Sequence, residues 1–534
     1  MNPSTTGTTR ARTTEMPQPK AQGFLAEWPW WLPPALLSLA LALYFVDPFI
    51  GDWDALDYTV LALNGKPSTL LLGRSLFIFY NRALWLTAHT LFNLPPEKAY
   101  LLFKYAVVAQ SPLAVMVWWR VTRELAKSRE AASIAALLLA TSSFYIIYSG
   151  QVMTEIPSIL LLGVSLLIHL RGLARRSFPV VIAGAALMGL SVNLREATAL
   201  YGVWLVLSPF VCGWRLGRRE VMTIALACVV FFIFALGGFG FFYLLNVGDY
   251  RYEWETSFHA LREESKRHPV RLANMGPLMW YFLLAAPVVL VSFPFAVWRE
   301  WKRRGLTPLL LLGVIGFLAN LSLIIHYSVV LNGRYLLTGV PAMIPLVGSY
   351  LMEAQVSLLG NRRRAFISAV VGAGLATALF SSYYWPGNYA YALSRARSKD
   401  YGERLVLLPQ DAVVIAGGQT VGVTYWRGVG LGRWDAIGTG AGWPGAALPS
   451  EIERDLNSGR RVFIDTDPRW WTPCGWQLAE IRQLTELEKR FRFRRASETI
   501  FEIRPPDDPS AQDAPNLEKL LPENRPEDAK YCSG

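Results

Sequence analysis

The sequence is poor in charged residues. Only 17% of its 534 residues are Asp, Glu, Lys or Arg, whereas an ordinary soluble protein contains about 25%. The hydrophobic fraction is 52% and the mean hydropathy is +0.27. These figures exclude a disordered chain and a simple soluble globule, and they favour a membrane protein with several spans.

Cysteine and histidine are scarce as well. Four Cys and five His residues exclude a disulfide scaffold, and none of their spacings resembles a zinc site. Cys474 and Cys532 fall in a region that we place outside the membrane, where a disulfide is permitted, but the sequence does not tell whether they pair. A site is therefore sought among carboxylates and arginines.

Apolar runs long enough to cross a bilayer fill the chain up to about residue 385. Eleven runs of about 15–25 residues are present, close to the roughly 20 that a spanning helix needs. We predict an α-helical polytopic membrane protein with about 11 transmembrane helices, at 28–46, 99–118, 131–149, 156–170, 178–193, 197–212, 221–245, 277–297, 306–328, 335–352 and 365–385.

The positive charge follows the predicted topology. Residues 1–385 contain 32 basic and 19 acidic residues, whereas residues 386–534 contain 20 and 21. Every second loop of the membrane part is rich in Lys and Arg, and the positive-inside rule places these loops and the N-terminus in the cytoplasm. This pattern accounts for the net charge of +12 without nucleic acid, and we expect a bacterial-type inner membrane protein.

Four regions follow from this topology. Residues 1–27 are a disordered cytoplasmic tail, 28–385 form the membrane domain with outer loops 47–98 and 246–276, 386–504 form an extracytoplasmic α/β domain, and 505–534 are a disordered tail. In the outer domain we predict strands at 404–408, 411–416, 461–465 and 497–503 and a helix at 476–490, but no element in the Gly-rich stretch 427–450. The Asp465-Thr466-Asp467 segment fits a surface turn better than a metal site.

The first outer loop is acidic. Four aspartates follow the first span within eleven residues: Asp47, Asp52, Asp54 and Asp57. A loop of Asp, Gly and Pro is one reading. Another is a general base for an acceptor hydroxyl or amine at the membrane surface. A third is a divalent cation held by Asp52 and Asp54.

Three arginines lie at outer boundaries of the predicted spans, namely Arg74, Arg195 and Arg334. One arginine there is usually a snorkelling residue, but three from distant segments suit a phosphate group, which Arg binds bidentately. Glu155 opens the fourth span on the same side and either lines this site or serves only as a helix-dipole partner.

The second outer loop is aromatic and contains His259 and His268. Its aromatics fit an interfacial belt or a lid that stacks on sugar. The histidines are candidate acid/base groups, although a surface position is the simpler reading of each.

These residues, in this order, resemble the GT-C superfamily of membrane glycosyltransferases, most of all protein O-mannosyltransferases and bacterial lipid A aminoarabinose transferases. The similarity covers about residues 28–352. Its elements are Asp54-Ala-Leu-Asp-Tyr58, Arg74-Ser-Leu, Glu155 in T-E-I-P-S, Arg195 after a Gly-Leu run, and Arg334-Tyr335-Leu-Leu. The usual Asp-Glu pair is missing because Ala55 follows Asp54, so either Asp52 or Asp54 is the base.

The resemblance implies a polyprenyl-phosphate sugar donor whose phosphate lies near the arginines. It implies an aspartate that activates the acceptor (a lipid, glycan or protein) for inversion at the anomeric carbon. It also implies no cofactor, with a cation at Asp52 and Asp54 as the less favoured alternative. A transporter or flippase of a lipid-linked sugar is the alternative function, but it usually shows repeated halves and mid-membrane charges. A noncatalytic scaffold leaves the arginines unexplained.

Overall fold

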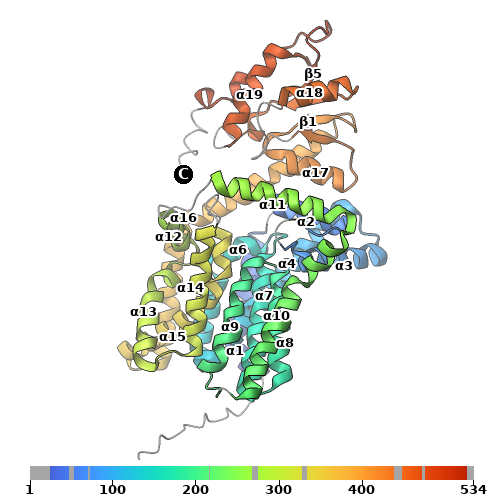
Figure 1. Cartoon of the computed structure of the whole chain (residues 1–534). Helices are drawn as coiled ribbons and strands as arrows, with labels where there is room; N and C mark the ends of the chain where they lie inside the picture. The colour runs from blue at the N-terminus through green and yellow to red at the C-terminus, as the bar shows by residue number, and fades with distance from the viewer. Residues whose placement is uncertain are drawn as a thin grey trace, which may run out of the picture.

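The computed structural model describes residues 24–46, 53–69, 72–215, 217–267, 275–326, 333–437, 448–471 and 476–525. It shows a tall bundle of helices and a smaller C-terminal α/β domain above it (Figure 1). The 44-residue helix α16 (Arg362–Leu405) runs from the bundle into the domain. The predicted class, a helical membrane protein with a small C-terminal sheet, is confirmed, but the predicted boundary at residue 386 falls inside this helix.

The bundle contains helical structure in the described part of each predicted span. Its elements are α1 (Trp28–Tyr44), α4 (Ala99–Ala126), α5 (Arg129–Ala140), α6 (Ser143–Ser149), α7 (Glu155–Arg175), α8 (Phe178–Val192), η3 (Glu196–Tyr201), α9 (Gly202–Val211), α10 (Arg218–Leu245), α12 (Met275–Ala285), α13 (Pro287–Arg304), α14 (Pro308–His326), η6 (Gly333–Thr338) and α15 (Val340–Leu359). Within the described ranges, four helices are long and apolar enough to cross a membrane, or up to six if each of two bent pairs is one span. The protein is therefore a multi-pass membrane protein, while the count of eleven spans stays a prediction.

The two bent pairs support each other at their breaks. The chain bends by 65° between α5 and α6 and by 103° between α12 and α13. At the breaks, Ser142 Oγ donates to the carbonyl of Ala285 and Ser143 Oγ to that of Leu284, each at 2.9 Å. Because a membrane interior offers no water to exposed backbone groups, such side-chain partners make a broken helix tolerable.

Both predicted outer loops contain helices. The first contains α2 (Trp53–Asn64) and α3 (Ser75–Phe92), and the second contains α11 (Tyr250–Arg267). These three helices lie across the end of the bundle that faces the C-terminal domain (Figure 1), which we call the domain-side end. Tyr250 fixes α11 there, since its hydroxyl donates to the carbonyl of Ser68 at 3.0 Å.

The C-terminal domain is built on a five-stranded sheet of order β2-β1-β3-β5-β4. β2 (Asp435–Ile437), β1 (Val413–Ile415) and β3 (Val462–Asp465) are parallel, whereas β5 (Ile500–Arg504) and β4 (Arg492–Arg495) are antiparallel to their neighbours. Helices α17 (Thr420–Gly428), α18 (Leu448–Asn457) and α19 (Trp476–Arg490) complete it. The strand predicted at 404–408 is wrong because Arg404 and Leu405 end α16, and β2 lies in the stretch where no element was expected.

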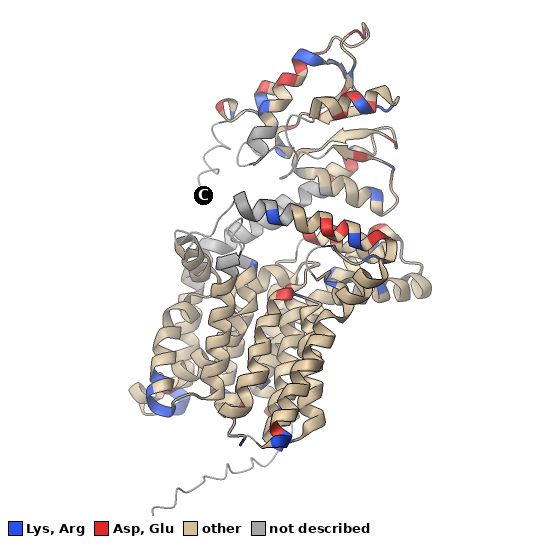
Figure 2. Cartoon of the chain, viewed as in Figure 1, with Lys and Arg blue, Asp and Glu red and all other residues tan. Residues whose placement is uncertain are grey.

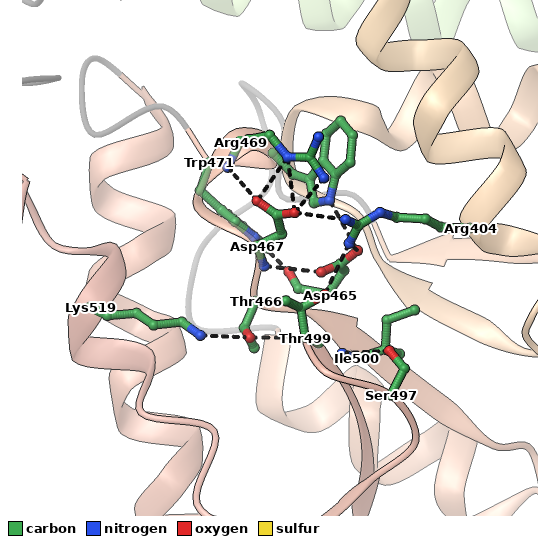
Figure 3. Close-up of polar contacts among 11 residues, drawn as sticks. Arg404, Asp465, Thr466, Asp467, Arg469, Trp471, Ser497, Thr499, Ile500 and Lys519 are labelled. Atoms are coloured by element: carbon green, nitrogen blue, oxygen red, sulfur yellow. Dashed lines mark hydrogen bonds and ion pairs between the residues drawn. The ribbon is translucent and has the colours of Figure 1, made fainter.

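The Asp465-Thr466-Asp467 segment is not a surface turn. Its three residues are at most 8% exposed. Arg404 at the end of α16 contacts the carboxylates of Asp465 and Asp467, both at 2.9 Å, and Arg469 binds Asp467 as well (Figure 3). These ion pairs join the long helix to the carboxyl end of β3. The segment predicted to be a surface turn thus anchors α16 to the sheet.

Two segments predicted to be disordered are ordered in part. Residues 505–525 pack on the domain, with Leu517 and Leu520 fully buried in its core. Residues Phe24–Glu27 form a 3-10 turn, and Glu27 is buried against Arg120 and Arg123 at 3.2 and 3.1 Å. Cys474 and Cys532 lie outside the described residues.

Charge is distributed unevenly along the bundle. Figure 2 shows Lys and Arg gathered at the end of the bundle away from the C-terminal domain, with little charge along the middle. This separation is what the positive-inside rule leads one to expect. The orientation itself, with the C-terminal domain outside the cytoplasm, stays a prediction.

Candidate active site

The candidate site lies at the domain-side end, beneath the transverse helices. Asp54 is in the first turn of α2, one of these helices. The helix packs on α3 through Tyr58, which is fully buried and meets Phe77 of α3 edge-on at 5.6 Å. Arg82 of α3 donates to the carbonyls of Ala62 and Leu63 at the other end of α2. α2 therefore presents Asp54 on a supported helix.

Arg334 links the two carboxylates that the sequence singled out. Its Nη2 lies 2.9 Å from Oδ2 of Asp54, and its Nε lies 3.9 Å from Oε1 of Glu155. Its side chain is 12% exposed. The segment that carries it, η6, approaches α14 closely: a Cβ on Gly339 would collide with the backbone of Gly316. Glycine at this position allows η6 to sit against the bundle.

Glu155 and Arg195 form the most buried ion pair of the site. Nη1 of Arg195 bonds Oε1 of Glu155, with side-chain exposures of 6% and 2%. Arg195 Nε also donates to Oγ1 of Thr338 at 3.2 Å. The other carboxylate oxygen of Glu155, Oε2, is buried and has no hydrogen-bond partner among the described residues. One acceptor of this site is therefore available to a ligand.

Arg74 completes the arginine set from a third direction. Its Nη1 lies 3.5 Å from Oδ2 of Asp54, and its Nε lies 3.2 Å from Oε1 of Glu196. It precedes α3 in a left-handed conformation with φ of 41°. A non-glycine residue in this region is uncommon and strained, and it persists where the surroundings hold it. Here two carboxylates hold the side chain.

Two tyrosines face the guanidinium groups. Arg74 lies over the ring of Tyr58 at 5.4 Å, while Arg195 and Arg334 lie over the ring of Tyr335 at 5.4 and 5.2 Å. Such contacts hold a cation in place without neutralising it. The structure thus brings together Asp54, Tyr58, Arg74, Glu155, Arg195, Arg334 and Tyr335, which come from distant parts of the chain.

One predicted site residue, His259, is not part of this assembly. It is exposed on α11, and within the described residues no contact joins it to the arginines or carboxylates of the site. Asp52 lies outside the described residues, as do Asp47 and His268. The choice between Asp52 and Asp54 therefore stays open, although only Asp54 is seen against the arginines.

Three residues of the site were not anticipated as such. Glu196 adjoins Arg195 in sequence but turns to Arg74. Thr338 bonds Arg195, and its carbonyl accepts from Tyr201 at 2.7 Å, so it joins η3 to η6. Asp57 lies on α2, and burial together with nearby Asp54 raises its pKa to about 6 although Arg74 opposes the rise. The acidic loop motif could have indicated Asp57, but not the other two.

No set of three or more His, Cys, Asp or Glu side chains suited to a metal ion occurs in the part of the chain that the structure describes. Asp52 lies outside that part. The cation reading of Asp52 and Asp54 is therefore neither supported nor removed.

In fold, the protein is similar to the crystal structure of an oligosaccharyltransferase from Archaeoglobus fulgidus in its apo form. The two share 14% identity with a TM-score of 0.53, and the match covers 89% of this chain and 73% of that one. No family model and no curated protein matches the sequence. The chain thus shares its fold with an oligosaccharyltransferase, whereas membership of the GT-C superfamily and the finer likeness to O-mannosyltransferases and aminoarabinose transferases stay predictions.

Proposed function

We propose that this protein is an integral-membrane glycosyltransferase that moves a sugar from a polyprenyl-phosphate donor to a lipid, glycan or protein acceptor at the outer membrane face. The observation that carries the proposal is the meeting of Asp54 and Glu155 with three arginines at one end of a membrane bundle. The shared fold with an oligosaccharyltransferase supports the same reaction class.

The arginines suit the donor phosphate. Arginine side chains such as Arg74, Arg195 and Arg334 match phosphate oxygens with paired N–H groups. In this structure their charges are balanced by Asp54, Glu155 and Glu196. A donor phosphate would compete for these cations. The pair of Arg334 and Asp54, with side chains 12% and 21% exposed, is more open to such competition than the pair of Arg195 and Glu155, at 6% and 2%.

Release of that pair gives Asp54 a role in the transfer step. The acceptor O–H or N–H loses its proton to the Asp54 carboxylate while the acceptor atom forms a bond to the anomeric carbon. The bond from that carbon to the phosphate oxygen breaks, and its electron pair leaves with polyprenyl phosphate. The arginines stabilise the charge that develops on this leaving group. A single displacement of this kind inverts the anomeric centre.

A polyprenyl chain cannot leave the bilayer, which is why such a site belongs at a bundle end. The exposed apolar side chains of α10, among them Phe232, Ile233 and Phe241 at 56–60% exposure, offer a surface for lipid on the bundle. A cofactor is not part of the proposal. Loss of transfer in EDTA that Mg²⁺ or Mn²⁺ restores would instead favour the cation at Asp52 and Asp54.

The proposal is tested by identifying the lipids that purify with the protein and then assaying transfer. Mass spectrometry is expected to find a polyprenyl-phosphate sugar, and proteoliposomes loaded with that lipid should release polyprenyl phosphate only when an acceptor is present. Movement of the intact lipid-linked sugar between leaflets, with no release of polyprenyl phosphate, would contradict the proposal and establish the transporter or flippase alternative.

A further inference from the structure

A second polar cavity lies at the other end of the bundle from the candidate active site. Its volume is about 360 Å³, and it opens between the ends of α4, α13 and α15 and the start of α16. Ligand pockets are commonly about 300–1,000 Å³, so this cleft is large enough for a small polar group. We call it the cationic cleft, after Lys127, Arg299, Arg303, Arg304 and Arg362 in its lining.

The cleft carries an excess of positive charge. Five cations and one carboxylate, Glu353, line it. Glu353 contacts three arginines at once, Arg299 at 3.8 Å, Arg303 at 3.1 Å and Arg304 at 3.0 Å. Two carboxylates outside the lining balance part of this charge, since Glu300 lies 3.6 Å from Arg304 and Glu124 lies 3.8 Å from Lys127. One shared carboxylate leaves guanidinium N–H groups for an anion.

Arg299 is the best-placed of these cations. Its side chain is only 19% exposed, and its guanidinium lies over the ring of Tyr350 at 5.7 Å. Its Nε is buried, makes no hydrogen bond among the described residues and lies 3.8 Å from Oε2 of Glu353. Within the described residues, this long ion pair is the one carboxylate contact recorded for Arg299. A held cation with only a long ion pair is suited to an anionic group that enters the cleft.

The surroundings place the cleft at the depth of lipid headgroups. Trp298 and Trp301 of α13 are 63% and 61% exposed beside it, and Lys302 lies over the ring of Trp298 at 5.1 Å. Exposed tryptophans gather where hydrocarbon meets headgroups. Earlier on the same helix, Val291 and Phe295 are 60% and 57% exposed, so an acyl chain could lie along α13 from the cleft.

We propose that the cationic cleft binds the phosphate headgroup of an anionic phospholipid. Basic pockets between helix ends at the cytoplasmic surface recognise such headgroups. The lipid would bridge α13 and α16 by contacting Arg299, Arg303 and Arg362. It would thereby stabilise the base of α16, the helix that reaches the C-terminal domain.

Native mass spectrometry of the full-length protein tests this, with phosphatidylglycerol and phosphatidylcholine offered together. The wild type is expected to retain phosphatidylglycerol in preference to phosphatidylcholine. In Arg299→Gln/Arg303→Gln the ratio of retained phosphatidylglycerol to phosphatidylcholine should fall about tenfold. Arg363→Gln/Arg364→Gln is the matched control, because it removes two charges from the same bundle end at exposed residues outside the cleft. The control is expected to behave as the wild type.

Three results would overturn the proposal: no preference for phosphatidylglycerol in the wild type, an equal loss in the control, or unchanged retention in the cleft variant. Inorganic phosphate gives the second arm. If millimolar phosphate raises the Tm and phosphatidylglycerol does not, the ligand is a free phosphate and not a lipid. Arg303→Gln alone, at a side chain that is 54% exposed, gives a variant expected to fold and to lose part of the preference.

Discussion

Arg334 pairs with Asp54 at 2.9 Å. This contact joins η6, which precedes α15, to α2, which follows α1. The pair adjoins the buried pair of Glu155 and Arg195, because Arg334 also lies 3.9 Å from Glu155. Arginines and carboxylates thus alternate through the site, and a phosphate is able to bind the arginines by displacing a carboxylate.

Replacement of Arg334 should weaken donor binding. Arg334→Ala removes a charge-assisted contact worth about 1.5–3 kcal/mol, so the KM for the polyprenyl-phosphate sugar should rise by about ten- to a hundredfold. Arg334→Lys should recover only part, because Lys keeps the charge but not the paired N–H groups. Steady-state transfer assays in proteoliposomes measure this. Arg262→Ala, at an exposed position on α11, is the control, and equal KM values for Arg334→Ala and this control would argue against the phosphate role.

The pair of Glu155 and Arg195 should matter for stability. Glu155→Gln leaves the buried guanidinium without its charge partner, and loss of one member of a buried pair costs about 3–5 kcal/mol. A large fall in Tm in detergent is expected. Glu155→Leu/Arg195→Met removes both charges and should regain much of the loss while remaining inactive. A double variant that is no more stable than Glu155→Gln would show that the pair is not the source of the effect.

Asp57 should make stability depend on pH. Burial and Asp54 raise the pKa of this carboxyl from 3.8 to about 6, so the folded state favours its neutral form. Its contribution to stability is therefore present at low pH and is lost as pH rises through about 4 to 6. Asp57→Asn should stabilise the protein by about 2 kcal/mol at about pH 7.5 and hardly at all at about pH 4. Unfolding curves at both pH values check this, and the same Tm difference at each would contradict it.

The same variant tests whether Asp57, in place of Asp52 or Asp54, is the base. If Asp57 accepts the acceptor's proton, kcat/KM for the acceptor should rise with pH through about 6 in the wild type, and Asp57→Asn should abolish both the inflection and most of the activity. If Asp54 is the base, Asp57→Asn should remain active.

The C-terminal domain should influence transfer through α2. Gly428 ends α17, and a Cβ there would lie 2.7 Å from Val60 on α2, two turns after Asp54. Gly428→Val should therefore displace α2 and lower kcat several-fold while changing the KM for the donor little. Gly422→Ala, on the same helix but near only the side chain of Gln419, is the control. Equal kcat values in the two variants would contradict this coupling.

Much of the site was predictable because membrane proteins restrict where charges occur. Asp54, Glu155 and the three arginines stood out as charges on the side away from the basic loops, and all of those five meet. Glu196 did not stand out, because a sequence does not tell which way a neighbour of Arg195 turns. Thr338 acts through a hydrogen bond that only the fold creates.

The fold was predictable to a similar extent. Apolar runs located the bundle helices, but not the breaks between α5 and α6 or between α12 and α13, which depend on serine contacts from a partner segment. The last apolar run placed the end of the last span near residue 385, yet α16 continues to Leu405. The anchoring of that helix by Asp465 and Asp467 is tertiary, and short motifs do not reveal it.

The central claim is that an aspartate in the first outer loop accepts the acceptor's proton while the arginines hold the donor. Single-turnover transfer by Asp54→Asn, with donor binding measured on the same proteoliposomes, tests it most directly. We predict that transfer falls by at least about a hundredfold, with donor affinity unchanged or tighter because Arg334 loses a competing anion. Near-full turnover in both Asp54→Asn and Asp52→Asn would contradict the account.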